Sequence, residues 1–214
     1  MHAIKVISLL AAIFLGTLLP ARQAGATDPA ENWATNSSPL KVEVKFIGGP
    51  GLMPVNRAFV TCGTNKFTFL MPDGFRLDIS QPRKLTLVSA DLSCLLTWRV
   101  LGPMPPEGTP LNHALYRNVL LSQHPGGKIL EEFSLAALGR FGPAFDLRWG
   151  ASGGLARRER IMFIESLAGV VEFSLVSSLE KFEAGKQEFD AWRLSFRASD
   201  ANGKLVVPMM SNKL

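Results

Sequence analysis

The clearest hydrophobic pattern of the chain lies in its C-terminal third. Between residues 169 and 176 apolar side chains alternate with polar ones, a period of two that is typical of a half-buried strand. The apolar residues on one face are Val171, Phe173 and Leu175. After the Ala184-Gly185 pair the period lengthens and predicts a helix, whose apolar stripe is Phe189, Trp192 and Phe196. Neither element can bury its apolar face alone, so we expect helix and strand to pack on each other or on a shared sheet.

Shorter alternating segments predict further strands. Lys41–Ile47 alternates cleanly, and lysines on its exposed side indicate an edge strand. Between Cys62 and Leu101 the spacing predicts an antiparallel meander of hairpin-joined strands, with Pro72-Asp73-Gly74 as its first turn. The meander strands are Lys66–Met71, Phe75–Ile79, Lys84–Ser89 and Ser93–Leu101. Later strands are expected at Ala144–Trp149 and Arg158–Ser166, whereas residues 52–61 show no firm period.

One further helix is predicted between the two groups of strands. Thr109 suits the N-cap and Pro110 the first helical position. The helix should end near Gln123, and its expected apolar stripe is Leu111, Leu115 and Val119. The next segment, Lys128–Leu138, fits a helix by propensity and a strand by alternation, and its flanking glycines favour the strand.

The N-terminal residues resemble an export signal. Lys5, an apolar run from Val6 to Leu19 and the small residues Ala24-Gly25-Ala26 predict a cleaved signal peptide over residues 1–26. The run is too short for a transmembrane anchor, which needs about 20 apolar residues. We expect a flexible lead-in over residues 27–39, one domain over 40–197 and a loosely attached tail over 198–214. The mature chain should therefore be exported, periplasmic or secreted, without a transmembrane segment.

Charge and composition exclude some partners. Cleavage would remove Lys5 and Arg22, leaving 21 basic and 18 acidic side chains and lowering the formal charge from +5 to +3. Nucleic-acid binders carry strongly basic faces, so we expect no nucleic-acid partner. The two cysteines, Cys62 and Cys94, are disulfide candidates in an oxidising compartment, and a bridge closing a loop of about 30 residues would stabilise by roughly 3–4 kcal/mol. Two buried free thiols are the alternative.

Catalytic and metal motifs are not apparent. His113 and His124 stand at opposite ends of the predicted helix and are expected to be surface residues, too far apart to share a metal. The segment Gly150–Gly154 departs from a nucleophile elbow and is better explained as a hairpin turn. We therefore expect no cofactor, metal or catalytic site. The basic residues Arg148, Arg157, Arg158 and Arg160, with Arg140 nearby, could gather near a hairpin turn as an anion or partner surface, or form a solvated strand end.

Several short segments of the sequence resemble those of the PsbP-like and DcrB-like families. They are FTFLMPDGF at residues 67–75, the strand series AFDLRWG, RERIMFIES and VVEFSLVSS, and the aromatic residues Phe182, Phe189, Trp192 and Phe196. The resemblance covers residues 66–196 and implies an α+β fold, an α/β/α sandwich with a central antiparallel sheet and two main helices. It also implies a non-enzymatic accessory or binding protein that contacts an unknown envelope protein, and we expect a monomer. The alternatives are a periplasmic carrier of a small apolar ligand and, less favoured, a hydrolase with an unrecognised site.

Overall fold

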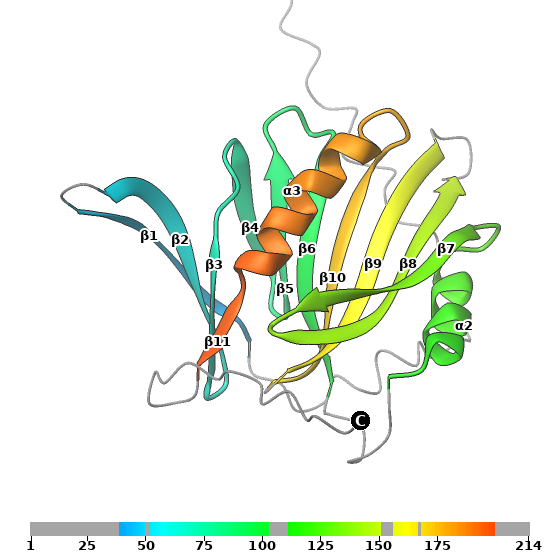
Figure 1. The fold of residues 1–214 in the computed structure, drawn as a ribbon, viewed down its shortest axis with the longest axis horizontal. Helices are drawn as coiled ribbons and strands as arrows, with labels where there is room; N and C mark the ends of the chain where they lie inside the picture. The colour runs from blue at the N-terminus through cyan, green and yellow to red at the C-terminus, as the bar shows by residue number, and fades with distance from the viewer. Residues whose placement is uncertain (1–38, 50–51, 103–110, 151–155, 167, 200–214) are drawn as a thin grey trace, which may run out of the picture.

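The computed structural model describes residues 39–49, 52–102, 111–150, 156–166 and 168–199, which form two antiparallel sheets and two helices (Figure 1). The four-stranded sheet has the order β1 (Lys41–Gly49), β2 (Leu52–Cys62), β3 (Asn65–Leu70), β11 (Arg197–Ser199). The seven-stranded sheet has the order β4 (Phe75–Gln81), β5 (Lys84–Ser89), β6 (Cys94–Gly102), β10 (Gly169–Ser178), β9 (Ala156–Ser166), β8 (Arg140–Gly150), β7 (Lys128–Ala137). The helices are α2 (His113–Gln123) and α3 (Phe182–Ser195).

The α+β class is confirmed, but a sandwich with one central sheet is too simple. The predicted meander divides between the sheets, because β3 pairs with β2 and β11 while β4 begins the second sheet. The turn before Phe75 exists, with Gly74 at φ +75°, yet it leads from one sheet to the other. Residues 52–61, where the sequence shows no firm period, belong to β2. Alternation identifies a strand but not the strand that it pairs with.

The main core lies where α3 meets both sheets. Phe189, Trp192 and Phe196 are buried as predicted, and the ring of Phe196 stacks on Phe69 of β3 with centroids 4.6 Å apart. The helix begins earlier than expected, at Phe182, and includes Ala184 and Gly185. A Cβ on Gly185 would lie 3.1 Å from Leu175 Cδ1, so glycine here allows α3 to approach β10 closely. The predicted packing of this helix on the adjacent strand is confirmed.

Helix α2 covers the opposite face of the seven-stranded sheet. Its buried residues are Tyr116 and Leu120, and the Tyr116 ring stacks on Phe163 of β9 with centroids 3.9 Å apart. The predicted stripe was therefore wrong, and Leu115 is exposed. The helix begins at His113, where the Asn112 side chain accepts a hydrogen bond from Ala114 N at 2.7 Å. The predicted cap residues, Thr109 and Pro110, lie outside the described residues. The ambiguous segment is strand β7, as the flanking glycines indicated.

The structure describes little of the predicted N-terminal segments but the first part of the predicted C-terminal tail. The signal peptide and the lead-in lie outside the described residues, so their prediction stays a prediction. At the C-terminal end, Ala198 and Ser199 belong to β11, which pairs with β3. This part of the expected loose tail is therefore attached, whereas residues 200–214 lie outside the described part of the chain. Strand β1 is at the edge of its sheet, as its lysines predicted.

Candidate contact surface and buried polar cluster

The structure separates the arginines that the sequence groups near the β8–β9 connection. Opposite residues of paired strands share a face, and Arg148 lies opposite Arg158, whereas Arg157 lies opposite Trp149 on the other face. Arg148 is exposed, Arg157 and Arg158 are half-buried, and Arg160 is buried. The four residues are thus brought to one end of one hairpin but not to one surface.

Arg160 belongs to the packed side of the sheet under α3. Its guanidinium donates two hydrogen bonds to the buried carboxylate of Asp146, at 2.7 and 2.8 Å. It also lies 4.8 Å from the centre of the Phe133 ring. A paired, bidentate arginine of this kind satisfies a buried carboxylate and is expensive to break. Its position indicates a structural role.

Arg158 joins this pair to the helix. Its guanidinium lies 3.9 Å from the centre of the Phe182 ring, and it reaches Asp146 at 3.6 Å and Glu183 at 3.4 Å. Arginine stacked on an aromatic ring at a half-buried position contributes both packing and electrostatic attraction. Arg158 therefore connects β9 to the first turn of α3.

Lys128 adds a further basic residue to the exposed surface at this end of the sheet. Lys128 of β7 lies directly opposite Arg148, which in turn lies opposite Arg158, so three basic residues occupy one row across three adjacent strands. We call Lys128, Arg148 and Arg158 the basic row. Sequence reasoning missed Lys128 because it depends on the register of β7 against β8. Lys128 and Arg148 are exposed, and no ion pair among the described residues involves either of them.

A buried polar cluster lies on the α2 face of the same strands. The Glu159 carboxylate accepts a hydrogen bond from Trp149 Nε1 at 3.1 Å, and the same oxygen lies 3.3 Å from His124 Nε2. The His124 and Trp149 rings stack with centroids 5.0 Å apart. His124 follows the last helical residue of α2, so the cluster attaches the end of that helix to the sheet. His124 is therefore half-buried, not the surface residue that the sequence predicted.

Burial sets the protonation of this cluster. It raises the pKa of Glu159 to about 8, and the negative charge of Glu172 acts in the same direction. It also lowers the pKa of His124, as does the positive charge of Arg99. Arg99 is itself bound to Glu172 by two hydrogen bonds, at 2.8 and 2.7 Å. Both members of the His124–Glu159 pair thus favour their neutral forms, and the pair offers a substrate little accessible surface.

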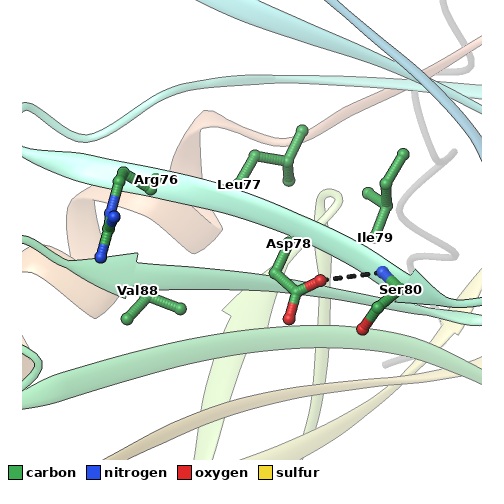
Figure 2. A pocket seen from close by; sticks show the side chains of 6 residues that line it. All are labelled: Arg76, Leu77, Asp78, Ile79, Ser80 and Val88. Atoms are coloured by element: carbon green, nitrogen blue, oxygen red, sulfur yellow. Dashed lines mark hydrogen bonds between the residues drawn. The ribbon is translucent and has the colours of Figure 1, made fainter. Parts of the chain in front are cut away.

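An open hollow of about 540 Å³ lies beside strand β4, the edge of the seven-stranded sheet (Figure 2). Asp78 accepts a hydrogen bond from Ser80 N at 2.8 Å, where the pairing with β5 is interrupted. This hydrogen bond is the main cause that lowers the pKa of Asp78. The lining residues are Arg76, Leu77, Asp78, Ile79, Ser80 and Val88. Because most of β4 is exposed, this hollow does not shield an apolar ligand from water.

The two cysteines are free thiols, not the predicted disulfide. Cys62 ends β2 in one sheet and Cys94 begins β6 in the other, and both point into the same apolar core. Burial raises the pKa of Cys94 to about 12 and also raises the pKa of Cys62. Thiols in such surroundings are inert as nucleophiles. The alternative of two buried thiols is the one that the structure has.

The described residues contain neither a metal-binding cluster nor a membrane-spanning helix. No group of three or more His, Cys, Asp or Glu side chains in this part of the chain is placed to hold a metal ion. Likewise, neither α2 nor α3 is long and apolar enough to cross a bilayer.

By its elements the chain is an α+β protein with two antiparallel sheets. Among solved structures it is similar to cyanobacterial PsbP (CyanoP) from Synechocystis sp. PCC 6803, with 13% identity, a TM-score of 0.47, and coverage of 76% of this chain and 94% of that one. It is also similar to PA94 from Pseudomonas aeruginosa, described as a protein of unknown function and putative regulator, with 17% identity, a TM-score of 0.35, and coverage of 57% and 88%. No family model and no curated protein matches the chain. The first likeness agrees with the predicted PsbP-like resemblance as a distant one, at the level of fold, and says nothing about what this chain does.

Proposed function

We propose that this chain is an exported, non-enzymatic accessory or binding protein that acts through a protein–protein contact surface. The surface is the exposed part of the basic row, Lys128 and Arg148, and its partner presents acidic side chains. The observation that supports this most directly is the register that aligns three positive charges across β7, β8 and β9. Like charges directly opposite each other on a sheet are destabilising. An acidic partner would relieve this repulsion.

The acidic residues near the basic row, Asp146 and Glu183, form ion pairs with basic residues other than Lys128 and Arg148. Asp146 receives Arg160 and Arg158, and Glu183 receives Arg158 and Lys186. Lys128 and Arg148 therefore extend toward solvent with their charge uncompensated by these carboxylates. Exposed charges of this kind set association rate and specificity more than raw affinity.

The test is site-specific crosslinking in the exporting host. A photoreactive residue at position 148 should capture a defined envelope protein, whereas the same residue at position 140 should not. Arg140 is the matched control because it is exposed, lies at the other end of β8 and pairs with Glu165 at 2.9 Å. Exported chains should also begin near Thr27, which N-terminal sequencing would show.

Charge reversal then separates a functional contact from a chance neighbour. The double variant Lys128→Glu/Arg148→Glu should abolish capture, and an acid-to-base change at the crosslinked site of the partner should restore it. Raised salt should weaken the contact, because exposed charge pairs are screened over about 8–10 Å. Capture that is equal at positions 140 and 148, or insensitive to the charge reversal, would refute the proposed surface.

A further inference from the structure

The β1–β2 arm is the part of β1 and β2 that extends beyond the third strand of their sheet, residues 46–49 and 53–56. Strand β3 pairs with β2 from Arg57 to Cys62, and Met71 N donates one further hydrogen bond to Asn56 O at 2.9 Å. Beyond Asn56 the arm is a two-stranded ribbon, seen at the left of Figure 1. Burial changes abruptly along β2. Ala58 and Val60 are in the core, whereas Met53 is 89% exposed. The sheet core therefore ends at Arg57, and the arm projects from it.

Apolar side chains are exposed on both faces of the arm. Phe46 is 71% exposed and Ile47 is 41% exposed, and consecutive strand residues point to opposite faces. Val55 lies directly opposite Ile47 and is also exposed. A bilayer surface can contact both faces of such a ribbon at once. Exposed apolar surface concentrated at one projection is typical of an interaction site.

Charged residues lie at the border between the arm and the sheet core. Neither segment of the arm contains Asp, Glu, Lys or Arg, and the first charged pair toward the core is Lys45 directly opposite Arg57. Glu43 contacts Lys45 at 3.2 Å as an exposed ion pair, so the three residues together carry a net positive charge. A charge-free apolar tip above a basic pair matches the order of layers at an anionic membrane surface, where headgroup phosphates lie outside the acyl chains.

From these observations we propose that the β1–β2 arm inserts shallowly into the surface of a membrane that contains anionic lipids. From the Lys45–Arg57 pair to Gly49 the arm spans about 14 Å, at about 3.4 Å per residue. The polar layer of one leaflet is roughly 5–8 Å thick, so the tip reaches the acyl boundary while the basic pair stays among the headgroups. The outer backbone groups of a two-stranded ribbon need polar partners, which limits insertion to this boundary. The basic row lies on β7, β8 and β9 of the other sheet, and these strands lie away from β1 and β2 in Figure 1.

The test places an environment-sensitive fluorophore on the arm of the full chain. Met53→Cys provides an exposed thiol for labelling, whereas Cys62 and Cys94 are buried. With vesicles of phosphatidylcholine containing 30% phosphatidylglycerol, we expect a blue-shifted emission and quenching by lipids that carry a quencher near the acyl boundary. A label at position 141, where Phe141 is 73% exposed on the other sheet, should show neither effect.

Variants then measure the contribution of the arm to vesicle binding, with every chain carrying the same N-terminus. Phe46→Ser/Met53→Ser should lower the partition coefficient about tenfold or more, whereas the matched control Phe141→Ser should leave it unchanged. Lys45→Gln/Arg57→Gln should lower it at least tenfold on the anionic vesicles and little on pure phosphatidylcholine, at about fivefold per charge.

Three outcomes would overturn the inference. One is an unshifted probe at position 53 on vesicles to which the chain binds. The second is binding that is lost with Arg148→Glu and retained in the arm variants, which would assign it to the basic row. The third is a crosslink from position 53 to a protein, formed equally with and without lipid, which would make the arm a protein-docking element.

Discussion

Replacing Glu159 by glutamine should stabilise the protein above neutral pH. Glutamine keeps an oxygen that can accept the hydrogen bond from Trp149, but it cannot ionise. In the folded chain burial raises the pKa of Glu159 from 4.5 to about 8, with a further contribution from Glu172. The folded state then binds more protons than the unfolded state between these two pH values. The free energy of unfolding of the wild type therefore falls as pH rises through this window, and that of Glu159→Gln does not.

The size of the effect follows from the linkage relation. Each pH unit inside the window changes the free energy of unfolding by at most about 1.4 kcal/mol. His124 acts with the opposite sign, because its lowered pKa makes the folded state lose stability as pH falls below its ordinary value of 6.5. Above pH 6.5 the unfolded histidine is largely neutral as well, so the range from 6.5 to 8 isolates Glu159. Over that range the difference between variant and wild type should grow by up to about 2 kcal/mol.

Urea unfolding followed by tryptophan fluorescence at pH 6.5, 7.0, 7.5 and 8.0 measures this difference. The matched control is Glu165→Gln, on the same strand at a partly exposed position paired with Arg140, and it should leave the pH slope of the wild type unchanged. A constant difference between Glu159→Gln and the wild type, or one that shrinks with rising pH, would show that Glu159 is ionised in the folded protein. The reasoning about its burial would then be wrong.

Three further predictions concern the core. Trp192→Ala should lower the free energy of unfolding by about 3–5 kcal/mol, measured by denaturant titration, because the buried indole fills the space between the sheets; a loss under 1 kcal/mol would contradict this packing. Gly142→Ala should prevent stable folding, judged by thermal unfolding, because its Cβ would lie 1.9 Å from Phe163 O, whereas Gly150→Ala meets no such contact and serves as the control. Cys62 and Cys94 should not react with a thiol reagent in the native protein but should both react after unfolding without reductant; two missing thiols would restore the predicted disulfide.

Much of the secondary structure could be predicted because local periodicity reports which side of an element is buried. The aromatic stripe of α3 and the alternation of β10 are long and regular. Strand β10 occurs where the pattern places it, and α3 contains the predicted stripe residues Phe189 and Trp192 but begins earlier, at Phe182. The prediction for α2 chose the wrong stripe because its apolar residues surround much of the helix. Only the position of the helix against Phe163 determines that Tyr116 and Leu120 face the sheet.

The candidate sites depend on contacts that the sequence does not encode locally. The arginines near the β8–β9 connection are visible in the sequence, but their division between two faces and the alignment of Lys128 with Arg148 follow from strand register. The His124–Glu159 pair joins a helix end to a strand 35 positions later, without a local motif.

By itself the sequence determined the alternating strands and the terminal amphipathic helix, because these are properties of neighbouring residues. Tertiary structure alone decided that β3 and β4 enter different sheets and that the two cysteines remain apart as thiols. It also decided that β1 and β2 project beyond their third strand. The physical reason is that strand partners, side-chain burial and the shape of an exposed surface arise from long-range packing, in which a short alternating segment has many equivalent choices.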